Sequence, residues 1–304
     1  MDRMTYHNPV LLNECIQGLN IKPEGIYVDV TFGGGGHSKS ILSKLNGGKL
    51  FAFDQDDSAN TNDLNHTDFK LINANFRHLK NFLKMEGVIK LDGLLADLGV
   101  SSNQFDIPER GFSTRFDGQL DMRMNVNSNL SAKDVINDYL EEDLANVLYK
   151  YGELRNSRII ANKIAIARKA SRINTTAELT DVISDLASEK YRNQFLARVF
   201  QSIRIEVNDE ITALEEMLLS AVELLNLDGR LVVLSYHSLE DRLVKNLMKK
   251  GNFEGKVEKD FFGNPIKKLK EINSKVIVAS DREIKENSRA RSARLRIAEK
   301  INDN

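Results

Sequence analysis

The stretch YVDVTFGGGGHSKSIL, residues 27–42, places four consecutive glycines between a short apolar run and a segment with helical spacing. The carboxyl end of a strand and the positive N-terminal end of a helix meet at such a position, and nucleotide-type ligands bind there. Glycine lets the main chain turn sharply and lets a ligand approach without a Cβ in the way. A turn that binds nothing would need one glycine, so four in a row indicate a ligand-binding turn.

Further apolar runs alternate with segments of helical spacing. The predicted strands are residues 26–30, 49–54, 69–73 and 91–97. The run GRLVVLSYHSLED, residues 229–241, predicts a later strand that leads into a helix, with Ser238 as the N-cap and Asp241 three residues on. Strands that alternate with helices predict an α/β fold with a parallel, doubly wound sheet.

The middle of the chain has the composition of helices. Residues 119–228 contain one glycine, Gly152, and residues 109–264 contain no proline. The segments SAKD (residues 131–134) and TTAE (residues 175–178) predict capping boxes at two helix starts.

The distribution of glycine and proline along the chain divides it into one doubly wound domain and an insertion. We expect the helical insertion at residues 109–205, and we expect residues 1–108 and 206–304 to form the two parts of the domain. The sequence contains no internal repeat and no low-complexity tract.

Composition limits the classes of site and of location. The single cysteine, Cys15, excludes an intrachain disulfide and a Cys-rich zinc site, and the five histidines show no paired-ligand spacing, so we predict no metal. We expect Cys15 to be a small core residue. No apolar run approaches the roughly 20 residues that span a bilayer, so we expect a cytoplasmic protein that binds no membrane. The net charge of −1 means that local basic patches would have to bind an anionic partner.

Three classes of nucleotide-binding turn can be compared with the glycines. The dinucleotide fingerprint G-x-G-x-x-G is incomplete, because Ser38 stands where the third glycine belongs after Gly33 and Gly35. The GK[ST] ending of a Walker motif is missing as well. The acidic D-x-G-x-G-x-G turn of S-adenosylmethionine (SAM) methyltransferases fits more closely, although Thr31 replaces its first glycine after Asp29.

The second predicted strand ends in Asp54. Both SAM and dinucleotide sites use a carboxylate at this position to accept hydrogen bonds from ribose hydroxyls. The alternative is an N-cap of the following helix, for which Asp56 and Asp57 are better placed. We therefore assign Asp54 to the ligand.

Ten segments resemble, in the same order, the RsmH (MraW) family of 16S ribosomal RNA cytosine N4-methyltransferases. They are YHNPVLLNE, VDVTFGGGGHS, AFDQD, DLGVSSNQFD, RGFS, LDMRM, YGELRNSRIIA, FQSIRIEVNDE, GRLVVLSYHSLEDRLVK and SRARSARLR. The departures are small: FQSIRI stands where FQALRI is common, and Ser288 replaces a proline often found before RARS. A shared fold alone would not produce ten ordered matches.

The resemblance implies a class I SAM-dependent methyltransferase domain, Rossmann-like in fold, with an inserted α-helical domain that recognises RNA. It implies S-adenosylmethionine as cofactor and, as substrate, a cytidine in the decoding region of 16S ribosomal RNA within the small subunit. The alternative is N-methylation of another RNA or DNA base. The oligomeric state stays open between a monomer and a homodimer.

Matching motif positions also imply the cofactor contacts. Main-chain N–H groups of the glycine turn would hold the methionine carboxylate of SAM, and Phe76 would offer a face to the adenine. The alternatives are a core role for Phe76 and a helix-capping role for His37. The implied cofactor contacts are Gly33, Gly35, Gly36, His37, Asp54, Phe76, Asp97 and Gln104.

Methyl transfer to cytosine N4 sets a further requirement. The lone pair of N4 is delocalised into the ring, and a hydrogen-bond acceptor beside N4 would restore its nucleophilicity. Asp97, Ser101 and Ser102 follow the fourth predicted strand and are the candidate catalytic residues.

The segment SYHSLEDR, at the end of a later strand, could bring His237, Glu240 and Asp241 to the same edge of the sheet. His237 is also a candidate contact to the RNA. The alternative for Glu240 and Asp241 is helix capping and surface pairing.

Two basic clusters could hold RNA phosphates, for which arginine forks are suited. The alternative is a charged face that is simply solvated. The C-terminal cluster comprises Arg289, Arg291, Arg294 and Arg296, and the cluster in the insertion comprises Arg155, Arg158, Lys163, Arg168, Lys169 and Arg172.

Two other classes of protein share part of this pattern. A nicotinamide oxidoreductase would share the glycine turn and Asp54, but the missing third glycine and the arginine cluster count against it. A non-catalytic RNA-binding protein would keep the arginines and lose the cofactor turn, whereas this chain has both.

Overall fold

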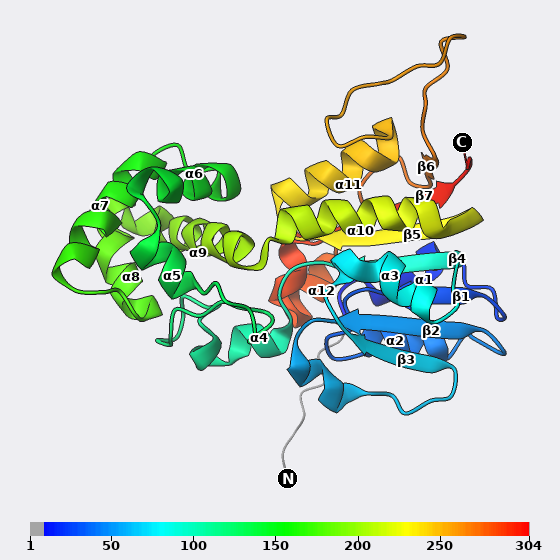
Figure 1. Ribbon diagram of the computed structural model, residues 1–304, viewed down its shortest axis with the longest axis horizontal. Helices are drawn as coiled ribbons and strands as arrows, with labels where there is room; N and C mark the ends of the chain where they lie inside the picture. Colours follow the sequence, from blue (N-terminus) through cyan, green and yellow to red (C-terminus); the bar gives the residue numbers. More distant parts are fainter. Residues whose placement is uncertain (1–8, 304) are drawn as a thin grey trace. The chain divides into compact units, whose positions relative to one another are not determined.

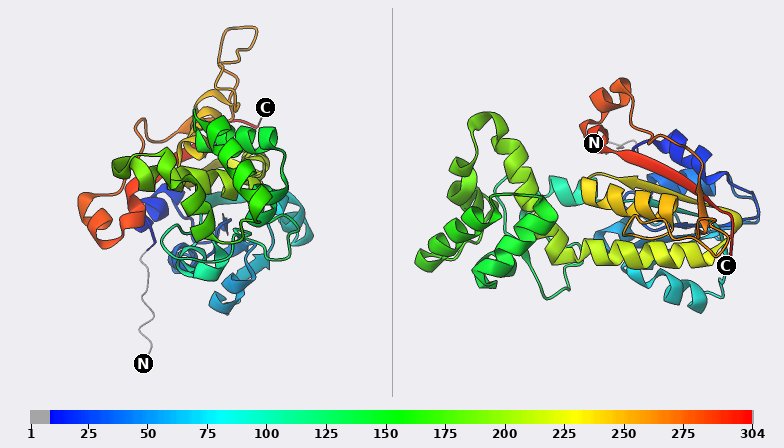
Figure 2. Two further views of the ribbon diagram at one scale, coloured as in Figure 1. Left: turned by 90° about the vertical axis from the view of Figure 1, so that its left-hand side faces the viewer. Right: turned by 90° about the horizontal axis from the view of Figure 1, so that it is seen from above.

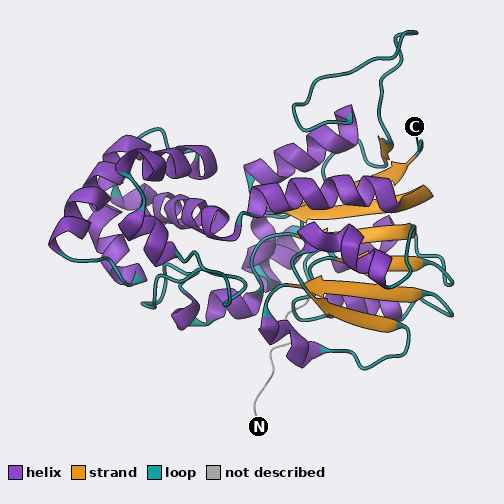
Figure 3. Ribbon diagram, viewed as in Figure 1, coloured by secondary structure: helices purple, strands orange, loops and turns teal. Residues whose placement is uncertain are grey.

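The computed structural model describes residues 9–303, except for the side chains of residues 102 and 103. The chain forms two compact units. Met1–Gly99 and Ile211–Asn304 make up the first, called the sheet unit here, and Val100–Glu210 make up the second, the helical unit. The helical unit begins earlier and ends later than the predicted insertion, residues 109–205. Among the described residues, the strands lie in the sheet unit (Figure 3).

The sheet unit is built on seven strands in the order β3-β2-β1-β4-β5-β7-β6 (Figure 1). The first five of these pair in parallel, whereas β7 runs antiparallel to both β5 and β6. This arrangement confirms the predicted parallel α/β fold and adds an antiparallel edge. The strands are β1 (Ile26–Asp29), β2 (Lys49–Asp54), β3 (Phe69–Asn73), β4 (Leu91–Asp97), β5 (Leu225–Ser235), β6 (Leu269–Glu271) and β7 (Arg294–Lys300).

Strand β1 lies between β2 and β4, so the order along the sheet reverses there. Ligands of doubly wound sheets bind beyond the carboxyl ends of the strands at such a switch point. The glycine turn follows β1 directly, so the topology brings it to this position.

Helices cover both faces of the sheet (Figure 2). Along β1, the buried Tyr27 belongs to one core cluster and the buried Val28 to another, because successive side chains of a strand point to opposite faces. Cys15 is fully buried in the Tyr27 cluster, which confirms its predicted core role. The helices of this unit are α1 (Leu12–Leu19), α2 (Gly36–Leu42), α3 (Leu79–Met85), α10 (Glu210–Leu224), α11 (Ser238–Lys250) and α12 (Asp281–Glu286), with 3-10 turns η1 (Asp57–Asn62), η2 (Phe76–His78) and η6 (Ser288–Ser292).

The helical unit has a core cluster of its own, which includes the fully buried Val135, Leu148, Ile160 and Val199. Its helices are α4 (Ser102–Asp106), α5 (Ala132–Asp138), α6 (Glu141–Gly152), α7 (Ser157–Ala170), α8 (Thr176–Ile183) and α9 (Arg192–Asn208), with 3-10 turns η3 (Pro108–Arg110), η4 (Ser184–Leu186) and η5 (Glu189–Tyr191). A separate core explains why the unit is compact by itself.

Both predicted capping boxes are present in the helical unit. Ser131 accepts the N–H of Asp134 at the start of α5, and Thr175 accepts the N–H of Glu178 at the start of α8. In each box the acidic side chain accepts the N–H of the N-cap residue in return. The local sequence determines these helix starts, because each box satisfies two main-chain donors that the helix leaves unpaired.

The predicted N-cap Ser238 is wrong. The N-cap of α11 is His237, whose Nδ1 accepts the N–H of Glu240, while the Glu240 carboxylate accepts the N–H of His237. A neutral imidazole nitrogen is a hydrogen-bond acceptor, so histidine can perform here the role that serine commonly has.

Among residues 9–303, no helix combines the length and the apolar character needed to cross a bilayer.

Candidate cofactor and substrate site

The glycine turn leaves β1 and enters α2. Gly33 and Gly35 have φ values of 51° and 73°, which side-chain-bearing residues rarely adopt. No heavy atom of the described chain lies within 4 Å of a Cβ placed on Gly33 or Gly34. The main chain therefore borders open space at these two residues. A Cβ on Gly36 would instead meet the ring of Pro9 at 2.3 Å, so packing within the protein already requires this glycine.

Asp29 holds the two ends of the turn together. It is almost fully buried, and its Oδ1 accepts the main-chain N–H of Thr31 at 3.1 Å and the Thr31 hydroxyl at 3.3 Å. Its Oδ2 accepts the hydroxyl of Ser38 at 2.7 Å. Because Thr31 precedes the glycines and Ser38 follows them, one carboxylate fixes the span of the turn.

Asp54, at the end of β2, joins the same turn. Its Oδ2 accepts the N–H of Gly33 at 2.8 Å and its Oδ1 accepts the N–H of Asp56 at 2.9 Å. Asp56 is the N-cap of η1, so the capping role belongs to Asp56 and not to Asp54. Burial raises the pKa of Asp54 to about 6, although the two N–H donors oppose this shift. A carboxylate with two oxygens beside open glycines can also accept ligand hydroxyls.

Asp97, at the end of β4, forms a second polar group next to the turn. The hydroxyl of Tyr236 donates to Asp97 Oδ1 at 2.6 Å, and the main-chain N–H of Asp97 donates to the hydroxyl of Thr31 at 2.6 Å. Burial raises the pKa of Asp97, while His37 and the bond from Tyr236 lower it. Burial and the nearby Asp97 raise the pKa of Tyr236, so Tyr236 is the proton donor of this pair.

His37, in α2, connects the turn with Asp97. Its Nε2 lies 3.2 Å from the carbonyl oxygen of Val10, and its Nδ1 lies 3.7 Å from Asp97 Oδ2. A carbonyl oxygen can only accept, so Nε2 carries a proton and Nδ1 is the nitrogen that faces Asp97. Gly35 is the N-cap of α2, and no side chain caps this helix, so the alternative capping role of His37 is wrong.

The remaining predicted site residues are Phe76 of the sheet unit and Ser101, Ser102 and Gln104 of the helical unit. Phe76 opens η2 after β3, is half-buried and packs against the core cluster of one sheet face. In the helical unit, the N–H of Ser101 donates to Gln104 Oε1 at 3.1 Å, and the N–H of Gln104 donates to Ser101 Oγ at 3.2 Å. The side chain of Ser102 lies outside the described residues.

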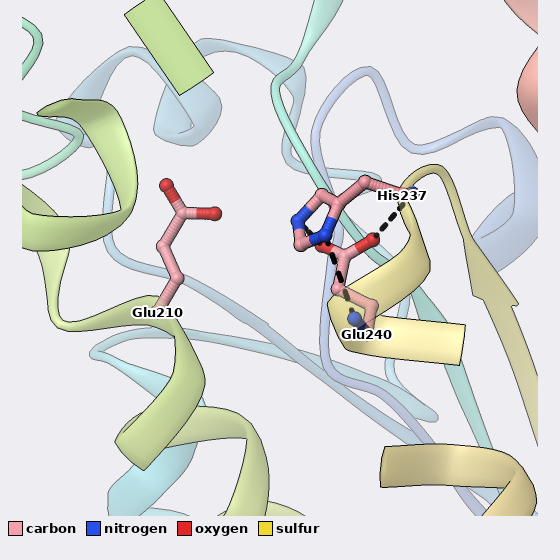
Figure 4. Close-up of side chains that lie close together, drawn as sticks. All are labelled: Glu210, His237 and Glu240. Atoms are coloured by element: carbon pink, nitrogen blue, oxygen red, sulfur yellow. Dashed lines mark hydrogen bonds and ion pairs between the residues drawn. The ribbon is translucent and has the colours of Figure 1, made fainter. Parts of the chain in front are cut away.

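His237 and Glu240 lie together at the start of α11 (Figure 4). Both side chains are nearly buried, and His237 Nε2 is 3.1 Å from Glu240 Oε1. Asp241, also buried, accepts two hydrogen bonds from Arg296 at 2.7 and 3.1 Å and one from Arg294 at 3.3 Å. The capping alternative is therefore what the structure shows for Glu240, whereas Asp241 forms a buried ion pair and not the surface pairing that was the alternative for it.

This pairing divides the C-terminal arginine cluster. The side chain of Arg296 is only 14% exposed and is bound to Asp241, whereas that of Arg294 is 53% exposed. Arg291 is exposed in η6 and, with Tyr236, His237 and Arg294, lines a hollow of about 230 Å³. Arg289 lies in the same short helix, half-buried.

The basic cluster of the helical unit is partly neutralised within that unit. Arg168 donates to the carbonyl oxygens of Ile136 and Tyr139, both at 2.6 Å, and thereby supports the end of α5. Arg172 pairs with Asp138, and Lys163 pairs with Asp185. The remaining members of the predicted cluster, Arg155, Arg158 and Lys169, are exposed.

Sequence reasoning did not single out Tyr236, the hydrogen-bond partner of Asp97. It lies within the segment SYHSLEDR, directly after β5, which pairs with β4. The sequence offered one signal: a tyrosine follows β5, and β5 pairs with β4, the strand that ends in Asp97.

The comparisons with known proteins agree with these observations. The chain matches the family described as the MraW methylase family over residues 4–301. A protein of Flavobacterium johnsoniae named ribosomal RNA small subunit methyltransferase H is 57% identical over 299 residues, which cover 98% of this chain and 99% of the relative. A protein of the same name from Bacteroides thetaiotaomicron is 55% identical over 300 residues, with coverage of 98% and 99%.

A solved structure described as a putative rRNA-methylase from Clostridium thermocellum is more distant in sequence. It is 14% identical, has a TM-score of 0.44 and covers 96% of this chain and 98% of that chain. The family assignment therefore depends on the sequence relatives.

The family match confirms the predicted resemblance and S-adenosylmethionine as the cofactor. The residues of the turn are suited to bind S-adenosylmethionine in three respects. Open space borders Gly33 and Gly34, the N-terminus of α2 faces the turn, and Asp54 offers a carboxylate beside Gly33.

We predict that replacing Asp54 by asparagine changes how stability depends on pH. The folded chain raises the pKa of Asp54 to about 6, above the value of about 3.9 for an exposed aspartate, so the folded state binds this proton more tightly than the unfolded state. The stability contributed by the protonated carboxyl is present below about pH 4 and is lost as the pH rises through about 6. Asparagine does not titrate and avoids this loss.

Urea unfolding of the wild type and of Asp54→Asn at a series of pH values measures the effect. The free energy of unfolding of the variant, minus that of the wild type, should rise between about pH 4 and about pH 7 and then level off. A difference that stays constant over this range would show that the carboxyl titrates as an exposed group.

Proposed function

We propose, from the premise that the chain belongs to the MraW methylase family, that it methylates the N4 amine of a cytidine in the decoding region of 16S ribosomal RNA. The observation that carries this proposal is the position of Asp97. It ends β4 beside the glycine turn, is bonded to that turn through Thr31, and has one carboxylate oxygen fixed by Tyr236. The two relatives named as small-subunit methyltransferases support ribosomal RNA as the substrate.

The cofactor contacts of the proposal follow the fit of the turn. Bound SAM supplies an electrophilic methyl group on a sulfonium. Main-chain N–H groups of the glycine turn would hold its carboxylate, Asp54 would accept its ribose hydroxyls, and Phe76 would face its adenine. We propose Gly33, Gly35, Gly36, His37, Asp97 and Gln104 as the remaining contacts.

Asp97 would activate the substrate amine. Methyl transfer would form the bond from N4 to the methyl carbon and break the bond from that carbon to the sulfonium sulfur. N4 would then lose one proton, which the Asp97 carboxylate or solvent can accept. A carboxylate that accepts a hydrogen bond from the N4–H group raises the electron density on N4 and disperses the developing positive charge. Oδ1 of Asp97 is bonded to Tyr236, so Oδ2 is the oxygen available for N4. Ser101 and Ser102 are further candidates for this acceptor role.

We place the reaction in the cytoplasm, on RNA of the small ribosomal subunit, with exposed arginines as phosphate contacts. Arg291 and Arg294, whose side chains are exposed, fit this role better than the half-buried Arg289 and than Arg296, whose side chain is mostly buried against Asp241. His237 stands as a further candidate at the same hollow. Methylation of another RNA or DNA base is the alternative, and a homodimer is the oligomeric state to test.

Mass spectrometry of nucleosides tests the function directly. Small subunits from a strain that lacks the corresponding gene are digested before and after incubation with the protein and SAM. We expect N4-methylated cytidine derivatives to appear only after incubation, at a single site found by mapping RNA fragments. A methylated base of another kind would support the alternative substrate.

We predict that Tyr236→Phe lowers the turnover number about tenfold or more. The variant keeps the ring and removes the hydrogen bond to Asp97, and bonds to charged groups contribute about 1.5–3 kcal/mol. Because that bond lowers the pKa of Asp97, its loss should also move the acidic limb of the pH–rate profile to higher pH. Turnover and an acidic limb equal to those of the wild type would show that Tyr236 only fills space.

We predict opposite effects for two arginines of the C-terminal cluster. Arg296→Ala should lower the free energy of unfolding by about 3 kcal/mol, because it leaves the buried Asp241 poorly paired. It should not change the salt dependence of RNA binding. Arg291→Ala should leave stability within about 0.5 kcal/mol and reduce the salt slope of RNA binding by about one unit. Chemical denaturation and salt titrations of both variants check this, and the reverse pattern would contradict the division of the cluster.

A further inference from the structure

The hollow at the start of α11 forms where two antiparallel strands meet. Strand β5 ends at Ser235, which pairs with Arg294, the first residue of β7. The chain that follows β5 and the chain that precedes β7 therefore wall the same space, which we call the arginine hollow. Its lining includes Tyr236, His237, Ser238, Val278, Arg291 and Arg294.

The walls of the arginine hollow are ordered. Ile277 and Leu295 exchange two main-chain hydrogen bonds, of 3.1 and 2.9 Å, which fix the preceding loop against β7. Asn287 caps η6, the 3-10 turn that carries Arg291, and Ala290 of the same turn is fully buried. The backbone that carries Arg291 is therefore fixed before a ligand binds.

The lining of the arginine hollow is positive. Arg291 is exposed, and its guanidinium has no partner within the described residues. Arg294 donates from Nη1 to Asp241 at 3.3 Å, and its other two nitrogens have no partner in the part of the chain that the structure describes. No carboxylate of residues 9–303 lines the hollow. An anion can therefore approach both guanidinium groups.

Two carboxylates lie behind this lining, and both are engaged within the protein. Asp241 accepts two hydrogen bonds from Arg296, and Glu240 accepts two main-chain N–H groups at the start of α11. The segments that form the walls, residues 236–242 and 278–296, together contain seven lysines and arginines and five acidic residues. The walls therefore keep a net positive charge.

Tyr236 connects the arginine hollow with the proposed acceptor of N4. Its side chain forms part of the wall, and its hydroxyl donates to Asp97 Oδ1 at 2.6 Å. One tyrosine side chain therefore separates the two guanidinium groups from the carboxylate. This arrangement suits the two ends of one nucleotide, its phosphate and its base.

The size of the hollow decides which part of a nucleotide it takes. Pockets that enclose a whole small molecule measure about 300–1,000 Å³. The arginine hollow, at about 230 Å³, is smaller. It is too small to enclose a complete nucleotide, whereas a phosphate group fits into this volume.

We propose that the arginine hollow binds the phosphate of the nucleotide whose base is methylated, with Arg291 and Arg294 as its ligands. Arginine forks match two phosphate oxygens at once, and a phosphate fixed here would hold the attached base beside Asp97. The arginines would then position the reacting nucleotide, beyond a general contact with the RNA backbone. The inference rests on the proposed function, since it takes a cytidine of ribosomal RNA as the substrate.

Calorimetry of small probes with the full-length protein tests the phosphate site. The probes are cytidine, cytidine 3′-monophosphate, cytidine 5′-monophosphate and ribose 5-phosphate. The wild type should bind one of the two monophosphates about tenfold or more tightly than cytidine, because hydrogen bonds between charged groups are strong. The preferred isomer identifies which phosphate of the RNA chain occupies the hollow. Ribose 5-phosphate, which has no base, should bind more weakly than this isomer.

Variants of Arg291 show whether the hollow is responsible. Arg291→Gln should lower affinity for the preferred monophosphate about tenfold and leave cytidine affinity unchanged. Arg291→Lys keeps the charge but loses the fork, so its affinity should lie between those of the wild type and Arg291→Gln. Lys249→Gln is the matched control, because it removes one exposed positive charge from the far end of α11. It should bind the monophosphate normally, and all three variants should keep the melting temperature and SAM affinity of the wild type.

Three outcomes would overturn the proposal. Equal binding of cytidine and both monophosphates by the wild type, or no binding of any of them at millimolar concentration, would show that the hollow holds no phosphate. Equal losses in Arg291→Gln and Lys249→Gln would show an effect of net charge alone. A fall in SAM affinity in Arg291→Gln would assign the hollow to the carboxylate of the cofactor.

Uridine monophosphate separates this inference from the proposed function. Uracil carries a carbonyl oxygen where cytosine carries N4, so Asp97 should favour the cytidine nucleotide about tenfold. Equal affinity for the two nucleotides, with the dependence on Arg291 intact, would contradict the proposed base and keep the phosphate site. Loss of the dependence on Arg291, with the preference for cytidine intact, would contradict the phosphate site alone.

Discussion

The hydrogen bonds of Asp29 are the constraint on which the cofactor turn depends. One buried carboxylate binds Thr31 before the glycines and Ser38 after them, and so determines where the flexible main chain between them runs. Glycine has the largest choice of backbone conformations, so ordering a run of four costs much conformational entropy, and these hydrogen bonds help to offset that cost. The hydroxyl of Thr31 also accepts the N–H of Asp97, which ties the turn to the next strand.

Three aspartates end three neighbouring strands: Asp29 on β1, Asp54 on β2 and Asp97 on β4. Their negative charges act on one another, and the charge of Asp29 contributes to the raised pKa of both Asp54 and Asp97. N–H and O–H donors bind at least one oxygen of each carboxylate, but the concentration of charge still costs stability. A cationic sulfonium in the same place would relieve that repulsion, which gives the acidic edge a physical reason in a methyltransferase.

The parts of this structure that the sequence predicted are those that short stretches determine. Apolar runs between glycines indicate the strands, and the capping boxes at Ser131 and Thr175 depend on three following residues. The misassigned cap of α11 was a local error, because Ser238 has the commoner capping side chain but His237 has the suitable position. The bond from Tyr236 to Asp97 spans 139 residues of sequence, and the pairing of Arg296 with Asp241 spans 55. Both require the sheet order, which no local pattern contains.

The most direct test of the account measures SAM affinity of the variant Gly34→Ala by calorimetry. Gly34 does not have the positive φ of its neighbours Gly33 and Gly35, and an added Cβ would meet no atom of the described chain within 4 Å. The variant should therefore fold with the stability of the wild type. If the open space beside the turn is where the cofactor lies, SAM should bind at least tenfold more weakly. Wild-type affinity in a folded Gly34→Ala protein would contradict the assignment of this turn to the cofactor.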